Sequence, residues 1–430
     1  MKRVSFLTLG CKVNQYETQA IKEQLLQAGC VETSPEEAVD VFVVNTCTVT
    51  EIAAAKSRRA VNNLIKKHPG ARIIVTGCYI DSNPDEFSRR PGVTQATNAR
   101  KAGLVAEFLK GDAREVDNNI LNLSICKFDK HTRAFLKVED GCDLHCTYCI
   151  IPQVRGPVCS RTIADCLMEA GRLVANGHKE IILTGIHLGA FGRGSRAEGE
   201  TLPGLLAELA PLPGLERLRL SSIEINEITQ DLLDVVAAHP NICPHFHLPL
   251  QAGHDLILKR MGRKYRRDQV LKVTGEIKSR WPRPALTTDI IVGFPGETEE
   301  HWRATLDLCR QVAFMKIHIF PYSYRQGTPA AGFKGHLSGE IINRRKAELA
   351  VVGMEMALDY KRQFLGEIVY PLIETTRDNA TGKLTGMTER YLRTLIDGPD
   401  DLGNKIVPVQ VQQVTPGQVL GQASFSALEC

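Results

Sequence analysis

The chain has 430 residues, of which 43% are hydrophobic and 24% charged, as in a globular protein of two to four domains. A formal net charge of +4 does not by itself indicate nucleic-acid binding, and no apolar run reaches the roughly 18 residues of a transmembrane helix. The 13 cysteines lack the spacing of a secreted disulfide framework, so we expect a cytoplasmic protein whose clustered thiols bind metal.

Residues 1–118 predict an α/β domain with a doubly wound parallel sheet. Strand patterns and helical patterns alternate along this segment. The strands are expected at residues 4–9, 41–45 and 72–76, and the helices at residues 14–28 and 51–67. In such a sheet the carboxyl ends of the strands lie along one edge, where ligands bind.

Three cysteines of this domain, Cys11, Cys47 and Cys78, each lie just past the expected carboxyl end of a strand. Residues that are far apart in the sequence therefore meet at one edge of the sheet. Two interpretations remain: three structural cysteines, which are commonly buried, or one shared metal cluster. The repeated placement in the strand–helix unit favours the cluster.

Residues 119–132 are polar and irregular, which predicts a linker. Residues 133–362 predict a second α/β unit with strands separated by helical segments. The strands are expected at residues 135–138, 181–184, 217–221, 245–248, 286–292 and 316–320. Because these strands are too few for the usual eight-stranded barrel, we predict a partial (β/α)6 TIM-like barrel with its active site at the carboxyl ends of the strands.

The first strand of this barrel is followed by the spacing Cys142-x3-Cys146-x2-Cys149. Three thiolates hold three irons of a [4Fe–4S] cluster and leave the fourth iron open, whereas structural zinc takes four ligands. His145 is the alternative fourth ligand of a zinc site, although its position directly before Cys146 disfavours that geometry. The trio therefore predicts an iron–sulfur cluster with a reactive iron.

After about residue 363 the pattern changes to short strands between glycine and Asp-Gly turns, which predicts a small antiparallel β-barrel over residues 363–430. This segment contains five Lys/Arg and eight Asp/Glu residues, a balance that does not favour a phosphate backbone. Residues 259–267 include six basic residues and are the better candidates for phosphate contacts. Arg155 and Arg161 are candidates for bidentate pairing with a carboxylate or a phosphate.

The CxxxCxxC spacing, with an aromatic residue before its last cysteine and a partial barrel behind it, resembles the radical S-adenosylmethionine superfamily. Within that superfamily, segments from the whole chain resemble the methylthiotransferases. The segments are GCKVNQYET, VNTCTVT, VTGCY, EDGCDLHCTYCIIPQVRGPVCSR, RLSSIE, HLPLQAG, MGRKY and TDIIVGFPGETEE. The C-terminal barrel is similar to a TRAM domain. GCKVNQ and VNTCTVT are most similar to the enzymes that act on N6-threonylcarbamoyladenosine in tRNA.

The resemblance implies two [4Fe–4S] clusters and S-adenosylmethionine as cofactors. The implied ligands are the radical-cluster trio (Cys142, Cys146, Cys149) and the auxiliary trio (Cys11, Cys47, Cys78). The implied reaction converts threonylcarbamoyladenosine, 3′ of the tRNA anticodon, to its 2-methylthio derivative, with electrons from a flavodoxin or ferredoxin. No general acid or base is assigned beyond the cluster ligands, because an aromatic C2–H has no useful acidity.

Contacts to S-adenosylmethionine are expected at the strand ends of the barrel. The candidates are Tyr148, Gly185, Ser222, Val292 and Gly293. The stretch around Gly185 departs from the Gly-Gly-Glu of many superfamily members, so the partner of the cofactor's amino group stays unassigned. For the glycines, a turn that needs unusual backbone angles is the alternative explanation.

Two alternative functions stay open. The same chemistry would act on isopentenyladenosine in tRNA or on an aspartate of a ribosomal protein. A zinc-dependent RNA-binding module without redox activity is the alternative from another class. We expect no association with membranes, and the sequence does not predict the oligomeric state.

Overall fold

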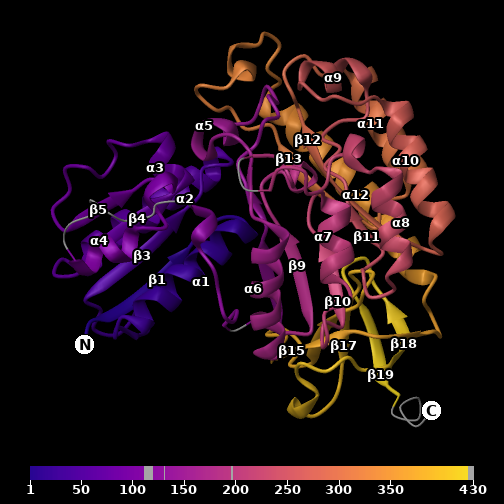
Figure 1. Ribbon diagram of the computed structural model, residues 1–430. Helices are drawn as coiled ribbons and strands as arrows, with labels where there is room; N and C mark the ends of the chain where they lie inside the picture. Colours follow the sequence, from indigo (N-terminus) through magenta and orange to yellow (C-terminus); the bar gives the residue numbers. More distant parts are fainter. Residues whose placement is uncertain (111–119, 130, 195–196, 425–430) are drawn as a thin grey trace.

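The computed structural model describes residues 1–110, 120–129, 131–194 and 197–424. Its N-terminal domain is a fully parallel sheet with helices on both faces (Figure 1). Its strand order is β2-β1-β3-β4-β5. The strands are β1 (Arg3–Thr8), β2 (Val31–Glu32), β3 (Val41–Thr46), β4 (Arg72–Gly77) and β5 (Val93–Ala96). The helices are α1 (Lys12–Gln27), α2 (Glu51–Lys67), α3 (Cys78–Ser82) and α4 (Leu104–Lys110). Residues 111–119, at the expected end of this domain, lie outside the described residues.

The segment expected to be a linker packs into the core instead of running over the surface. Its apolar residues Leu123, Ile125 and Phe128 are at most 3% exposed and join the same hydrophobic cluster as Tyr16 of α1. The sequence pattern looked polar because the apolar residues alternate with charged and amide residues. These residues therefore belong to the core that the two domains share.

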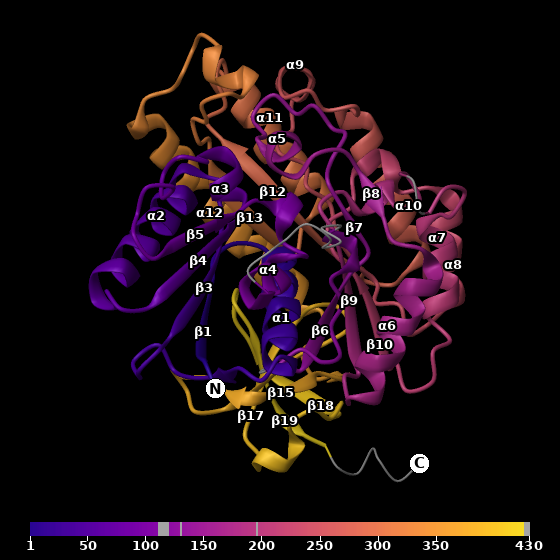
Figure 2. The same ribbon diagram turned by 60° about the vertical axis from the view of Figure 1, so that its left-hand side comes forward.

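The central domain contains the six expected parallel strands, arranged as two three-stranded sheets (Figures 1 and 2). The first sheet contains β6 (Arg133–Lys137), β9 (Glu180–Thr184) and β10 (Arg217–Leu220). The second contains β11 (His245–His247), β12 (Ala285–Val292) and β13 (Lys316–Pro321). Single bridges, Leu218 to Ile242 and Ser222 to His247, join β10 to the β11 region, so the six strands form one partial barrel.

Helices cover the outside of the barrel, while the side between β6 and β13 faces α1 of the N-terminal domain (Figure 2). The helices are α5 (Ile151–Arg155), α6 (Ile163–Ala175), α7 (Leu202–Leu209), α8 (Gln230–Ala238), α9 (Asp255–Arg260), α10 (Arg267–Arg280), α11 (Glu299–Val312) and α12 (Gly339–Arg362). Two short antiparallel strands, β7 (Glu139–Asp140) and β8 (Cys159–Ser160), also pair with each other. Within the described ranges, every helix is too short or too polar to be a membrane span.

The C-terminal domain is a six-stranded sheet with its own hydrophobic core. Its strands are β14 (Ile368–Val369), β15 (Leu372–Arg377), β16 (Leu384–Met387), β17 (Arg393–Ile396), β18 (Val409–Val414) and β19 (Val419–Ala423). The pairing is antiparallel as expected, except that β17 and β19 run parallel. Every Lys and Arg side chain in the described part of this domain pairs with a carboxylate of the same domain.

Two buried arginines of β10 fasten the C-terminal domain to the bottom of the barrel. Arg219 pairs with Glu180 at 2.7 Å and donates to the backbone carbonyls of Thr388 and Glu389, each at 2.9 Å. Arg217 donates to the carbonyl of Met387 at 2.9 Å. These bonds fix the loop before β17 under the barrel.

Arg219→Met is expected to loosen this docking. It leaves Glu180 and two carbonyls without their donor, a loss of about 1–3 kcal/mol. Hydrogen–deuterium exchange of β16 and β17 should therefore accelerate by roughly tenfold or more. Arg303→Met removes an arginine whose side chain is 78% exposed and should leave exchange unchanged. Equal exchange in the two variants would contradict the role of Arg219.

Candidate functional site

The cysteines of the auxiliary trio lie at one edge of the N-terminal sheet. Cys11 precedes α1, Cys47 follows β3, and Cys78 begins α3, and the strands before them are neighbours in the order β1-β3-β4. Gly10, with φ of +110°, permits the close approach: a Cβ there would lie 2.8 Å from Cβ of Cys47. Burial, with smaller contributions from Cys11 and Cys78, raises the pKa of Cys47 to about 11.

Cys78 is the best-supported sulfur of this trio. Nε of Arg155 donates to its Sγ at 3.3 Å, and Nδ2 of Asn98 lies 3.7 Å from the same atom. Hydrogen bonds to the sulfur ligands stabilise a reduced cluster and tune its potential. Arg155 thus carries positive charge from the central domain to the edge of the auxiliary trio.

A buried ionic network holds Arg155 in place. Glu17 of α1 is fully buried and contacts Arg155 at 2.6 Å, Lys101 at 2.5 Å and Lys137 at 3.0 Å. Asp140 lies 2.9 Å from Arg155 and 2.5 Å from Lys137. Arg155 therefore pairs with carboxylates, one of the two roles expected from the sequence, and its partners are protein groups. The network joins the N-terminal domain to the barrel.

The radical-cluster trio lies on the loop between β7 and α5. Cys142 and Cys149 are partly buried, and burial raises the pKa of their thiols to about 12 and about 11. Nη1 of Arg263 lies 3.4 Å from Sγ of Cys146. Arg263 also pairs with Glu224, and its side chain is only 3% exposed. This arginine of the basic run 259–267 therefore faces the cluster site and not a phosphate backbone.

A cavity of about 220 Å³ adjoins the radical-cluster trio. Two of the expected cofactor contacts, Tyr148 and Ser222, line it. Gly185, Val292 and Gly293 do not line it. Gly185 packs against the carboxylate of Glu139, 2.0 Å from the position of an added Cβ, and Val292 is fully buried in the core. A Cβ on Gly293 would meet Ile342 at 2.5 Å, so tight packing explains that glycine.

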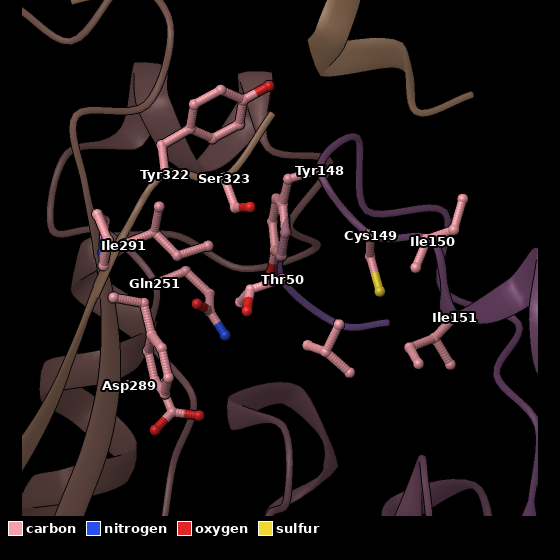
Figure 3. Close-up of a pocket in the computed structure, with 13 residues that line it drawn as sticks. Thr50, Tyr148, Cys149, Ile150, Ile151, Gln251, Asp289, Ile291, Tyr322 and Ser323 are labelled. Carbon is pink, nitrogen blue, oxygen red and sulfur yellow. The ribbon is translucent and has the colours of Figure 1, made fainter. Parts of the chain in front are cut away.

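A second cavity, of about 190 Å³, is lined by residues of the radical-cluster loop, of the barrel and of the N-terminal domain (Figure 3). Cys149 and Ile151 form one side, and Val49 and Thr50, just after Cys47, approach from the N-terminal domain. Figure 3 shows Gln251 and Asp289 across the cavity from Cys149 and Ile151. Ile150 also packs with Cys78 of the auxiliary trio. A substrate here touches the surroundings of both trios.

The spacing of the thiols does not suit single zinc ions. Tetrahedral zinc–thiolate bonds of 2.3 Å place sulfur ligands about 3.8 Å apart. In the part of the chain that the structure describes, His247, Asp289 and His318 are the one set of potential metal ligands within 4.8 Å of one another. Neither trio is that compact, and His145 is exposed and joins no such set. The geometry therefore disfavours a mononuclear zinc site.

Several side chains at the site were not predicted from the sequence as individual residues. Glu224 and Arg263 belong to the segments RLSSIE and MGRKY, whose resemblance was the available signal, and both line the 220 Å³ cavity with His187. Glu139 has a buried carboxylate oxygen without a hydrogen-bond partner and raises the pKa of the nearby Cys142. Glu139 is the first residue of the segment EDGCDLHCTYC, whose resemblance was again the available signal.

Comparison with protein families matches residues 3–97 to "Uncharacterized protein family UPF0004" and residues 136–309 to the radical SAM superfamily. Threonylcarbamoyladenosine tRNA methylthiotransferase MtaB of Bacillus subtilis (strain 168) is 36% identical over 96% of this chain and 94% of its own length. The enzyme of the same name from Thermotoga maritima is 34% identical, with 91% of each chain covered. A tRNA-2-methylthio-N(6)-dimethylallyladenosine synthase of Frankia alni is 35% identical over 88% of this chain and 79% of its own.

Solved structures support the fold. The radical S-adenosylmethionine methyltransferase TsrM from Kitasatospora setae aligns with a TM-score of 0.56 at 15% identity, covering 77% of each chain. With full-length relatives above 30% identity and with matches to both family models, the chain belongs to the radical S-adenosylmethionine methylthiotransferase family.

Proposed function

We propose that this enzyme converts N6-threonylcarbamoyladenosine in tRNA, next to the anticodon, to its 2-methylthio derivative. The observation that carries the proposal is the 190 Å³ cavity, which is lined by Cys149 of the radical-cluster trio and by Val49 and Thr50, just after Cys47 of the auxiliary trio. A reaction that removes hydrogen from a carbon and attaches sulfur to it needs both centres within reach of one atom. The tRNA substrate also implies a cytoplasmic enzyme, and the reductant is a low-potential donor such as a flavodoxin or ferredoxin.

The cysteine trios hold the two [4Fe–4S] clusters in this proposal. When both clusters and S-adenosylmethionine are bound, they supply the radical that removes the C2 hydrogen of adenosine and the methylthio group that replaces it. The chain positions these partners and excludes water. Tyr148, which packs edge-on against Phe294 at 6.5 Å, and Ile151 line both cavities.

S-adenosylmethionine occupies the 220 Å³ cavity in this scheme. Ser222, Arg263 and Glu224 supply polar groups to that cavity, and an arginine suits the cofactor's carboxylate. The unpartnered oxygen of Glu139 lies beside Gly185, outside the residues that line this cavity, so the partner of the cofactor's amino group stays unassigned.

Isopentenyladenosine is the second candidate substrate. The relative named for dimethylallyladenosine is 35% identical, against 36% for the Bacillus enzyme, so identity alone does not separate the two nucleosides. The apolar wall of the cavity, from Ile150, Ile151 and Ile291, also suits an isoprenoid group.

Nucleoside mass spectrometry of tRNA decides between the substrates. Deleting the gene is expected to remove 2-methylthio-N6-threonylcarbamoyladenosine completely, with the unmethylthiolated nucleoside in its place. The isopentenyl derivative serves as the internal control and should stay constant. An unchanged threonylcarbamoyl product, or selective loss of the isopentenyl product, would refute the proposed substrate.

A further inference from the structure

Two histidines and an aspartate of the barrel come together at one end of the 190 Å³ cavity. His247, Asp289 and His318 lie on the neighbouring strands β11, β12 and β13, and each offers a ligand atom within 4.8 Å of the other two. The strand register explains this. Asp289 pairs with His318, and His247 pairs with Thr287, which lies on the same face of β12 as Asp289. Three adjacent strands therefore place these side chains in one layer of the barrel.

This layer forms the floor of the cavity. Ile291 and Phe320, two residues further along β12 and β13, pair with each other and line the cavity. Asp289 also lines it, and Figure 3 shows its carboxylate at the end of the cavity that is remote from Tyr322. A ligand bound by Asp289 in this layer therefore borders the space that we assign to the substrate.

The distances suit a zinc ion. Bonds of about 2.0–2.1 Å from zinc to nitrogen or oxygen, at tetrahedral angles, place two ligand atoms about 3.3 Å apart. Nε2 of His247 and Oδ1 of Asp289 are 3.3 Å apart. The ring of His318 stands at 75° to the ring of His247, with the centroids 5.6 Å apart. Since its ligand nitrogen already lies within 4.8 Å of the other two ligand atoms, a small side-chain movement completes the set.

Thr287 supports His247 as a ligand. Its hydroxyl lies 2.9 Å from Nδ1 of the His247 ring. When Nδ1–H donates to this hydroxyl, Nε2 keeps its lone pair on the side of Asp289. Metal-binding histidines commonly donate their second ring N–H to a protein group, which fixes the orientation of the ring.

We propose that His247, Asp289 and His318 bind one divalent transition-metal ion, for which Zn²⁺ is the best match. Three protein ligands made of imidazole and carboxylate are typical of catalytic zinc sites, which keep the fourth position open for water or a substrate oxygen. Mg²⁺ and Ca²⁺ prefer oxygen ligands alone, and Mn²⁺ and Fe²⁺ generally bind a given site more weakly than Zn²⁺. The inference goes beyond the proposed function, because this site requires neither of the two clusters.

A proton shared by His247 and Asp289 is the competing explanation. Such a pair needs one imidazole, whereas the structure brings a second one, that of His318, to the same place. Burial, Lys316 and Lys12 lower the pKa of His318, which disfavours a second proton in this layer. The same positive charges weaken a cation that is held mainly by charge, such as Mg²⁺, more than one that is held by imidazole nitrogens.

Zinc binding by the anaerobic holoenzyme tests the site. Protein with its iron–sulfur clusters assembled is equilibrated with Zn²⁺, and excess metal is removed by gel filtration. The wild type should keep about one zinc per chain, and X-ray absorption at the zinc edge should show nitrogen and oxygen ligands at about 2.0–2.1 Å, without sulfur at about 2.3 Å. Iron does not interfere, because the edge is specific for zinc.

Asp289→Asn and His318→Gln, which preserve side-chain polarity, should each lose the bound zinc. Thr287→Val removes only the supporting hydroxyl and should weaken zinc binding roughly 10–100-fold in equilibrium dialysis. His131→Gln removes an exposed histidine outside this layer and is the matched control, which should bind zinc as the wild type does. An iron content of about eight per chain shows that each variant is folded.

Three results would overturn the inference. The wild type could keep no zinc after gel filtration. Asp289→Asn and His318→Gln could keep as much zinc as the wild type. The zinc edge could show sulfur ligands, which would place the ion in a cysteine trio instead of this layer.

Discussion

Cys47→Ala is expected to abolish methylthiolation of tRNA while reductive cleavage of S-adenosylmethionine continues. Cys47 is 6% exposed and belongs to the trio on the N-terminal sheet, whereas the cofactor cavity lies against the trio of the barrel. The variant therefore loses only the auxiliary cluster. Iron should fall from about eight to about four per chain, and 5′-deoxyadenosine should still form when reductant is added.

Cys142→Ala provides the complementary result. It should abolish 5′-deoxyadenosine formation and keep about four irons per chain in the auxiliary cluster. Cys126→Ala, which removes an exposed thiol outside both trios, should behave as the wild type. If Cys47→Ala and Cys142→Ala both lose cofactor cleavage, the two centres are not separable and the division of roles is wrong.

Glu17→Gln is expected to cause the largest loss of stability among the single substitutions considered. Among the described residues, the change leaves the buried Lys101 without a carboxylate partner, and it leaves Arg155 and Lys137 with Asp140 alone. Removing one partner from a buried charge network costs about 3–5 kcal/mol. Urea unfolding should show this as a lower midpoint, and the N-terminal domain should detach from the barrel first. Arg155 would also release Cys78, so auxiliary iron should be lost more readily.

The loss of stability caused by Glu17→Gln should depend on pH. Burial alone would raise the pKa of Glu17, but Arg155, Lys101 and Lys137 hold this pKa well below its usual range. A carboxyl with a depressed folded pKa contributes its full stability above the unfolded value of about 4.3 and loses it as pH falls through the folded pKa. The difference in the free energy of unfolding between the wild type and Glu17→Gln should be largest at neutral pH and should shrink in acid. Glu208→Gln, on the exposed face of α7, should show no difference at any pH.

The order of strands and the convergence of the auxiliary trio follow from local patterns. Each strand of the parallel sheets is an apolar run followed by a turn, and a parallel sheet places all such turns at one edge. Helix α2 spans Glu51–Lys67, as its pattern predicts, because Thr50 caps it and His68-Pro69 ends it. These features depend on neighbours in the sequence.

Residues whose role depends on distant partners were not predictable in this way. Glu17 lies in the middle of α1, yet its partners come from residues 101 to 155. The linker was misjudged for the same reason: Leu123 and Phe128 show their burial only once the core of α1 and β6 surrounds them.

The most direct test is Mössbauer spectroscopy combined with iron and sulfide quantification on protein purified without oxygen. Two cysteine trios that each hold a cluster with one open iron require about eight irons and eight sulfides per chain, all in [4Fe–4S] form. Addition of S-adenosylmethionine should perturb one iron of one cluster. About four irons per chain, or zinc in place of iron, would contradict the assignment of two reactive clusters.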